Sequence, residues 1–334
     1  MAVTQAARLS PEDWSKYWRQ PAITTFSQQF PGNYDGEIAA FWSQQFADLA
    51  DGSTVIDLAT GNGAVALLAV REAAKLGRAW TVRGVDYADI RPTTDLSDLP
   101  DVQRDLGVIE FIGKTNIEAT GLTDTNADLI VSQYGFEYSD VERAAHEAYR
   151  LLKPGGRIAL IVHHAQSGVM LESAEGLSQM QFMMHKEQLD QRVEAVIRAA
   201  DQASDAGDKR WVVARKKLNS TLRRLQARAA KAAEPRGFIN SVAPSFVHAI
   251  EGLAAKNAQM RLQHVARMRD EVRAYQERMA DLRSAALDQA GCDALCEALK
   301  QAGFEQLERG MLHYGAQQIL MGWTVTAVRL RRHA

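Results

Sequence analysis

A glycine-rich turn at residues 60–63 is the part of the sequence whose residue types and spacing best suit ligand chemistry. This run, TGNG, follows the apolar stretch 54–59 and precedes an amphipathic segment that is typical of a helix. Glycines let the backbone approach a ligand closely, and a helix N-terminus presents unpaired N–H groups. Asp86 ends the next apolar stretch, where a carboxylate can accept hydrogen bonds from both hydroxyls of a ribose. The spacing predicts a nucleoside site at the carboxyl edge of a parallel sheet.

The spacing alone leaves two cofactors open. Gly61, Gly63 and Ala66 also satisfy the loose dinucleotide fingerprint, so an NAD-dependent oxidoreductase is one alternative. Asp57, however, lies inside the preceding apolar stretch, close to the turn. A carboxylate there suits a ligand with an amino group and a sulfonium charge, and it would be unfavourable beside a pyrophosphate. The residues therefore favour S-adenosylmethionine (SAM).

The elements that must position these residues alternate between strand and helix. Apolar strand-like runs and amphipathic helical segments follow one another through residues 51–165, which predicts a parallel sheet with helices on both faces. After residue 291 a helix and two strands complete this α/β core, to the end of the chain at 334. Residues 1–50 are rich in aromatic side chains and are expected to form a helical cap.

Residues 166–290 interrupt the α/β pattern. They contain almost no strand signal and are expected to form three or four long helices, broken most clearly at 235–237 and at Ala243–Pro244. Placed after the fifth strand, this helical insertion would act as a lid that shapes an acceptor pocket. The last helix carries an apolar seam of the coiled-coil type, which would pair with another helix of the insertion or form a homodimer. The seam residues are Val265, Met268, Val272, Tyr275, Met279, Leu282 and Ala286.

The pattern as a whole resembles the class I SAM-dependent methyltransferases. VIDLATGNG followed by GVDY resembles motifs I and II of that family, and FIGKTNIEATGLTDTNADLIVSQYGFEYSD resembles its acidic-loop and fourth-strand motifs. LLKPGGRIALIVHH resembles the strand that follows them, and the final helix and two strands resemble the family's antiparallel hairpin. The resemblance covers residues 54–165 and 291–330. It implies a doubly wound Rossmann-like sheet, to which the residue pattern adds an N-terminal helical cap and a large all-helical insertion after strand five.

The resemblance also implies which residues contact SAM. Asp86 would hold the ribose and Tyr87 would lie against the adenine, while Gln133 would sit beside the methyl group. The full set expected to contact the cofactor is Asp57, Ala59, Thr60, Gly61, Gly63, Asp86, Tyr87, Asn116, Ile117 and Gln133. No metal site is expected, because the two cysteines, Cys292 and Cys296, lack further ligands nearby in the sequence.

Candidates for the catalytic base follow strands four and five, where the acceptor would enter. For a hydroxyl acceptor the enzyme must align the substrate, exclude water and remove a proton. Tyr134, Tyr138, His163 and His164 lie in these stretches, together with Glu137. The two histidines would point to opposite faces of a continuing strand, and His164 is preferred because it lies nearest the strand end.

The stretch QYGF at 133–136 departs from the Asn- or Asp-Pro-Pro-aromatic tetrad of families that methylate base or amide nitrogens. The sequence therefore predicts methyl transfer to an oxygen or nitrogen of a small-molecule metabolite. Another alternative is a SAM-binding regulatory protein whose helices carry the function.

The overall charge excludes a strongly basic protein. The chain carries 39 Lys and Arg against 41 Asp and Glu, a net charge of -2, so no global field draws it to nucleic acid or membranes. One stretch, 209–236, is locally basic, and a methyltransferase that docks RNA, protein or lipid headgroups through it is an alternative. Its basic residues are Lys209, Arg210, Arg215, Lys216, Lys217, Arg223, Arg224, Arg228, Lys231 and Arg236. The N-terminus lacks the apolar region of a signal peptide, which predicts a cytoplasmic location.

Overall fold

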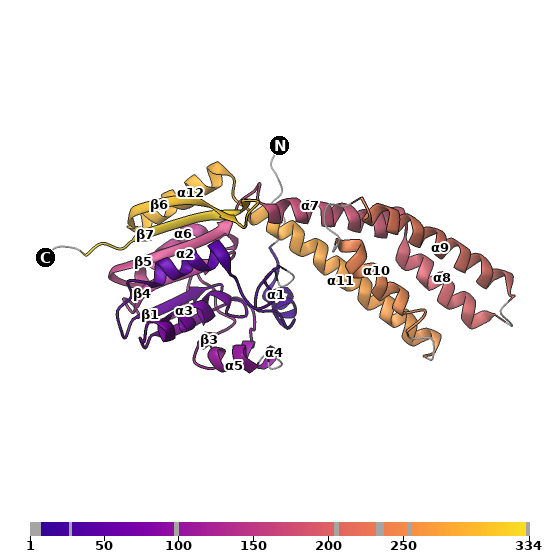
Figure 1. The fold of residues 1–334 in the computed structure, drawn as a ribbon, viewed down its shortest axis with the longest axis horizontal. Helices are drawn as coiled ribbons and strands as arrows, with labels where there is room; N and C mark the ends of the chain where they lie inside the picture. Colours follow the sequence, from indigo (N-terminus) through magenta and orange to yellow (C-terminus); the bar gives the residue numbers. More distant parts are fainter. Residues whose placement is uncertain are drawn as a thin grey trace. The chain divides into compact units, whose positions relative to one another are not determined.

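The computed structural model describes residues 8–26, 29–96, 100–203, 207–231, 237–252 and 256–331, which form two compact units (Figure 1). The first unit comprises Met1–Gly168 and Asp281–Ala334, and the second comprises Val169–Ala280. The second unit therefore interrupts the first along the chain, after the fifth strand.

The first unit is built on a mixed seven-stranded sheet. Its strands are β1 (Thr54–Leu58), β2 (Thr81–Val85), β3 (Glu110–Ile112), β4 (Ala127–Gln133), β5 (Leu152–His163), β6 (Glu305–Tyr314) and β7 (Ile319–Val328). Their order is β3-β2-β1-β4-β5-β7-β6, in which β1 to β5 are parallel and β7 is antiparallel to both neighbours. The order reverses between β1 and β4, and open α/β sheets bind their ligands at the carboxyl ends of the strands at such a point.

Helices cover both faces of this sheet. They are α2 (Gly36–Phe46), α3 (Ala64–Lys75), α4 (Pro92–Asp95), α5 (Pro100–Leu106), α6 (Val141–Leu151) and α12 (Gln289–Ala302), with a 3₁₀ turn, η1 (Phe136–Tyr138). Ile56 and Leu58 of β1 belong to an apolar core shared with α6 and α12. Asp57, which points to the other face, accepts a hydrogen bond from the N–H of Ala66 in α3. The predicted doubly wound α/β architecture is confirmed.

The N-terminal cap begins where the sequence predicts a helix. In α1 (Pro11–Trp18) the hydroxyl of Ser10 accepts a hydrogen bond from the N–H of Asp13 at 3.2 Å, which satisfies one of the free donors of the first turn. α2 buries Trp42 and Phe46, so simple packing accounts for these two rings.

The second unit is helical throughout its described residues. Its elements are α7 (Gly168–Gln181), a π-helical turn η2 (Phe182–Lys186), α8 (Leu189–Gln202), α9 (Lys209–Ala229), α10 (Phe238–His248) and α11 (Ala258–Ala285), of which α7 and α11 extend slightly into the first unit. The expectation of three or four long helices is therefore too low. Met183, Val193, Leu225 and Phe246 are among the residues that form this unit's own apolar core.

The break expected at Ala243–Pro244 is wrong, because Pro244 lies inside α10. A proline in a helix interior removes one backbone hydrogen bond. Ala243 and Phe246 beside it are buried in the core of the second unit, and this packing offsets the loss. The other expected break, at 235–237, lies largely outside the described residues.

The apolar seam of α11 is used within the second unit. Val265, Met268 and Val272 belong to its core, and Tyr275 packs against that core. These four residues therefore pack within the insertion, which is one of the two arrangements that the sequence left open. A homodimer through the insertion stays a prediction. Within the described part of the chain, no helix has the length and hydropathy needed to cross a bilayer.

Candidate functional site

The glycine-rich turn after β1 bends through left-handed backbone conformations. Gly61 and Gly63 have φ values of 55° and 86°, which glycine adopts at little cost. Ala59 also has a positive φ, of 57°, a conformation that an alanine adopts only with strain. Gly135, in the turn after β4, lies against it, since a Cβ on Gly135 would stand 2.4 Å from the Cβ of Ala59. The turns after β1 and β4 are therefore in direct contact.

Two buried carboxylates flank this turn. Asp57 accepts hydrogen bonds from the hydroxyl of Thr60 at 2.6 Å and from the N–H of Ala66 at 3.1 Å, and burial raises its pKa to about 7. Asp86 accepts hydrogen bonds from the N–H of Gly61 at 2.7 Å and from the N–H of Ala88 at 2.8 Å. Burial raises the pKa of Asp86 to about 6. The structure thus brings together two predicted carboxylates and the predicted turn.

The N-terminal segment closes over the same turn. The side-chain amide of Asn62 donates to the carbonyl oxygens of Trp18 at 3.0 Å and of Ala22 at 2.8 Å. The indole ring of Trp18 lies against Gly61, where a Cβ would stand 2.3 Å from ring atom Cζ2. Neither Trp18 nor Asn62 was predicted as a site residue. The only sequence signals are the aromatic richness of residues 1–50 and an asparagine inside the glycine turn.

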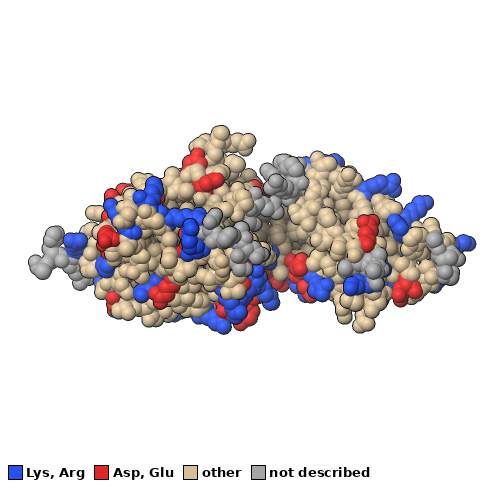
Figure 2. Space-filling model, turned by 60° about the horizontal axis from the view of Figure 1, so that its bottom comes forward, with Lys and Arg blue, Asp and Glu red and all other residues tan. Residues whose placement is uncertain are grey.

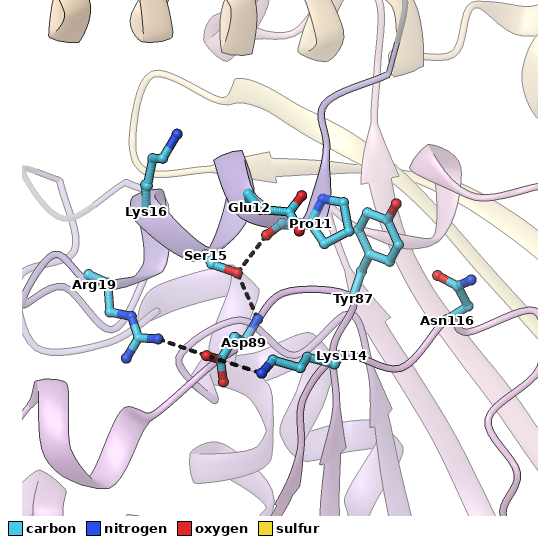
Figure 3. Close-up of a pocket in the computed structure, with 9 residues that line it drawn as sticks. All are labelled: Pro11, Glu12, Ser15, Lys16, Arg19, Tyr87, Asp89, Lys114 and Asn116. Carbon is cyan, nitrogen blue, oxygen red and sulfur yellow. Dashed lines mark hydrogen bonds and ion pairs between the residues drawn. The ribbon is translucent and has the colours of Figure 1, made fainter.

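A cavity of about 630 Å³ lies between α1 and the carboxyl ends of β2 and β3 (Figure 3). Tyr87 and Asn116, both predicted to contact the cofactor, line it, and Tyr87 is 40% exposed. Ile117 is buried in the apolar core of the sheet, so its side chain takes part in packing. On the α1 side, Arg19 donates to Asp89 at 3.1 Å, which ties the cap to the loop after β2.

Gln133 ends β4 and carries an unused donor. Its Oε1 accepts a hydrogen bond from the indole N–H of Trp42 at 2.6 Å. Its Nε2 is buried, and among the described residues it has no hydrogen-bond partner. A buried donor without a partner costs free energy, and a ligand that accepts from it would recover that cost.

The four candidate bases separate onto two faces of the sheet. His163 is stacked on Tyr134 with ring centroids 4.3 Å apart, and Tyr138 meets it edge-on at 6.0 Å. His164 instead stacks on Trp323, which belongs to the apolar core with α6 and α12. The two histidines therefore point to opposite faces, as predicted. His163 forms one cluster with Tyr134 and Tyr138, and His164 lies apart from it.

His164 has a structural hydrogen bond of its own. Its Nδ1 accepts from the N–H of Gln166 at 2.9 Å in the turn that follows β5. His163 is the last residue of β5 and is paired with Glu137, whose Oε1 lies 2.8 Å from its Nδ1. The geometry thus gives the two histidines different surroundings, and the preference for His164 stays a prediction that the structure does not favour.

Comparison with known proteins supports the nucleoside site that the strand order and the glycine turn indicate. Residues 56–160 match the family model described as a methyltransferase domain. Residues 56–160 are a class I methyltransferase domain.

Relatives of this methyltransferase domain include the ubiquinone/menaquinone biosynthesis C-methyltransferase UbiE of Klebsiella pneumoniae. The two are 32% identical over 114 residues, which are 33% of this chain and 42% of the relative. The enzyme of the same name from Hydrogenovibrio crunogenus is 26% identical over 141 residues, 39% of this chain and 54% of the relative. The chain thus spans about half the length of the curated relatives it matches. A solved structure of Haemonchus contortus phosphoethanolamine N-methyltransferase 2 with SAM is 14% identical, with 92% of this chain and 56% of that chain covered and a TM-score of 0.38.

SAM is the cofactor of this family, and the methyltransferase domain offers groups that fit it. Gly61 and Gly63 bring the backbone of the turn close to a ligand. Asp86, directly after β2, carries a carboxylate suited to the ribose hydroxyls. Gln133 offers the unpaired buried donor at the end of β4. The residues present therefore suit a nucleoside with a polar, charged tail.

Proposed function

We propose that the protein transfers a methyl group from SAM to an oxygen or nitrogen atom of a small-molecule acceptor. The observation that carries this proposal is the hydrogen bond between Asp86 and the N–H of Gly61, which joins the ribose-binding carboxylate and the glycine turn into one unit. When bound, SAM supplies an electrophilic methyl group on a positively charged sulfur. Asp57 provides a carboxylate beside the turn, where negative charge favours a cationic ligand.

The chain's own residues serve positioning and exclusion of water. Asp86 orients the ribose, and Gln133 presents its Nε2 donor at the end of β4. The segment around Trp18 covers the turn, and such closure keeps water from a reactive ligand. Holding the acceptor in line with the methyl group is the main contribution that this reaction requires of a protein.

The relatives support a small molecule as the acceptor. The UbiE relatives are named as C-methyltransferases of ubiquinone and menaquinone biosynthesis, so a ring carbon of a quinone-type molecule is the second candidate acceptor. Both candidates are small molecules.

A macromolecular acceptor is less well supported. Several basic side chains of α9 are paired within their own unit: Arg210 with Asp208, Arg224 with Glu187 and Arg228 with Glu175. On the face shown in Figure 2, acidic side chains lie among the basic ones. A paired and interspersed charge pattern gives little long-range attraction to nucleic acid or anionic lipid.

Calorimetric titration with S-adenosylhomocysteine (SAH) tests the proposal. Wild-type protein should bind SAH, and Asp86→Ala should bind it roughly 10- to 100-fold more weakly, since a hydrogen bond to a charged group is lost. Asp105→Ala is the matched control, because it removes a carboxylate that pairs with Arg71 at the protein surface. Failure of the wild type to bind SAH, with binding of NADH instead, would overturn the proposal in favour of the oxidoreductase.

A further inference from the structure

Glu137 and His163 form a buried acid–imidazole pair at the carboxyl edge of the sheet. Glu137 lies in η1, which a two-residue turn separates from β4, and His163 ends β5. One carboxylate oxygen, Oε1, lies 2.8 Å from Nδ1 of His163 and also accepts the backbone N–H of His163 at 2.7 Å. Both residues are at most 5% exposed. Two hydrogen bonds to one oxygen hold the imidazole in a single orientation.

This contact decides which ring nitrogen is available for proton transfer. Oε1 accepts the backbone N–H of His163 and faces Nδ1 with the same acceptor oxygen, so we assign the ring proton to Nδ1 and the lone pair to Nε2. The negative charge of Glu137 also stabilises the imidazolium that forms when Nε2 takes up a proton. The other oxygen, Oε2, is buried and has no hydrogen-bond partner among the described residues.

The pair lies next to the cofactor turn. Gly135, two residues before Glu137, packs against Ala59 of that turn. In the β4–β5 register Gln133 is opposite Ile161, and the side chain of His163 is on the same face of β5 as that of Ile161. This is also the face that α3 covers, because Val162 on the other face belongs to the core with α6 and α12. A proton acceptor therefore stands beside the place expected for the methyl group.

Aromatic rings surround the imidazole. Tyr134 stacks on it and Tyr138 meets it edge-on. Phe26 contacts Tyr134 at 5.5 Å and Trp14 contacts Tyr138 at 5.6 Å, so the N-terminal segment supplies the next rings outward. An acceptor that reaches Nε2 of His163 would therefore meet aromatic faces, against which a flat ring packs well.

The neighbouring titratable groups leave His163 as the base. Burial raises the pKa of the Tyr134 and Tyr138 phenols well above their ordinary value, so both stay neutral. Tyr34 lies near Tyr134, and burial raises its pKa as well. Asp281 lies near Tyr138 and accepts the N–H of Leu9 at 3.3 Å.

We propose that His163, oriented by Glu137, is the general base, and that the acceptor is a phenol-like molecule with a weakly acidic hydroxyl on a flat ring. The acceptor's O–H bond breaks and its proton passes to Nε2 of His163. The oxygen's electron pair forms the new bond to the methyl carbon, while the pair of the old carbon–sulfur bond stays on sulfur and yields SAH. The imidazolium then returns its proton to solvent. This step rests on the proposed methyl transfer, whereas the pairing of Glu137 with His163 does not.

Nuclear magnetic resonance of the full chain labelled with ¹⁵N-histidine tests the pairing without any turnover. Spectra of His163→Gln assign the signal of His163. We expect the Nδ1-protonated form in the wild type, and a pKa of His163 that falls by roughly 1 to 3 in Glu137→Gln, because a negative charge in contact with the ring is lost. Glu142→Gln, which removes an exposed carboxylate from the first turn of α6, should leave that pKa unchanged. An Nε2-protonated ring, or an equal pKa in Glu137→Gln, would overturn the role of Glu137.

4-Nitrophenol tests the acceptor class, because its phenolate absorbs visible light and its phenol does not. With SAH present and at a pH where the free compound is mostly protonated, wild-type protein should raise the phenolate absorbance. The increase should be lost in His163→Gln and reduced in Glu137→Gln. No increase in the wild type, or an equal increase in His163→Gln, would overturn the proposed acceptor and base. Calorimetry with SAH on the same variants should give unchanged affinity, so a failure of cofactor binding would be recognised separately.

Discussion

The indole ring of Trp18 occupies the space that a side chain on Gly61 would need. Gly61 also has a left-handed backbone conformation, with φ of 55°. Gly61 must therefore be glycine for two independent reasons. One is its backbone conformation, and the other is the nearby ring of the cap. They can be separated by mutation.

Gly61→Ala should destabilise the protein by roughly 2 to 4 kcal/mol, the sum of left-handed strain and the clash with Trp18. In the Trp18→Ala background the same change should cost only the strain, roughly 1 kcal/mol. Unfolding by urea measures all four proteins of the cycle. Gly77→Ala is the matched control, since Gly77 has φ of 64° and nothing within 4 Å of its would-be Cβ. If Gly61→Ala cost no more than Gly77→Ala, the contact with Trp18 would have no energetic weight.

Cofactor entry should require the segment around Trp18 to move. The ring covers the turn that SAH would approach, so only protein molecules in which the ring is displaced can bind SAH. The apparent association rate is therefore proportional to the fraction of protein in that state. Trp18→Ala should therefore bind SAH several-fold faster in stopped-flow measurements. Trp80→Ala removes an indole whose N–H donates a hydrogen bond to the carbonyl oxygen of Ala50, and this change should leave the rate unchanged. An unchanged rate in Trp18→Ala would mean that SAH enters without displacing the ring.

The parts of the site that the sequence predicts are those set by local spacing. The strand, the glycine turn and Asp86 follow from residues close together in the chain, and the hydrogen bond from Gly61 to Asp86 confirms that the turn and the carboxylate meet. The same local logic predicts the helix start at Ser10.

The parts that the sequence does not predict depend on contacts between distant segments. Trp18 meets Gly61 and Glu137 meets His163 only after the sheet and the cap have assembled. Pro244 shows the same limit for secondary structure, because packing of α10 in the helical core outweighs the local preference of proline.

Asp57→Asn should stabilise the protein at alkaline pH and have little effect in acid. Burial raises the pKa of Asp57 from 3.8 in the unfolded chain to about 7 in the folded one. The folded state therefore prefers the protonated form, so the stability from this group is present below about pH 4 and is lost as the pH rises through about 7. The variant, which cannot ionise, should gain on the order of 2 kcal/mol in free energy of unfolding near pH 8.

Glu147→Gln should change the pH dependence of stability in the opposite direction. Burial raises the pKa of Glu147, but hydrogen bonds from Arg150 and Thr120 outweigh it and lower the pKa overall. The ionised form is then favoured by folding, and its contribution is lost as the pH falls through the folded pKa. The variant should accordingly be most destabilising at neutral and alkaline pH. Denaturant unfolding at acid and alkaline pH measures both, and parallel pH dependences of the two variants would contradict these assignments.

Gly176→Ala in α7 should destabilise the helical unit, although alanine usually stabilises a helix by about 1 kcal/mol over glycine. A Cβ at Gly176 would stand 2.1 Å from the hydroxyl oxygen of Tyr275 in α11. In the Tyr275→Phe background this contact is gone, and Gly176→Ala should become neutral or stabilising. Thermal unfolding of the cycle measures the difference. A stabilising Gly176→Ala in the wild-type background would show that Tyr275 moves aside without cost.

SAH affinity should decline as the pH falls through about 6. Burial raises the pKa of Asp86 to about 6, and the ionised carboxylate is the form that accepts hydrogen bonds from both ribose hydroxyls. Binding is therefore full above this pH and weakens by up to about tenfold for each further pH unit below it. Calorimetry across this range should give that slope for the wild type and for Asp105→Ala. Asp86→Ala should bind weakly and should lack the decline centred near pH 6. A wild-type affinity that stays constant across the range would place the ribose away from Asp86, and the cofactor would then have to be held by the turn and Asp57 alone.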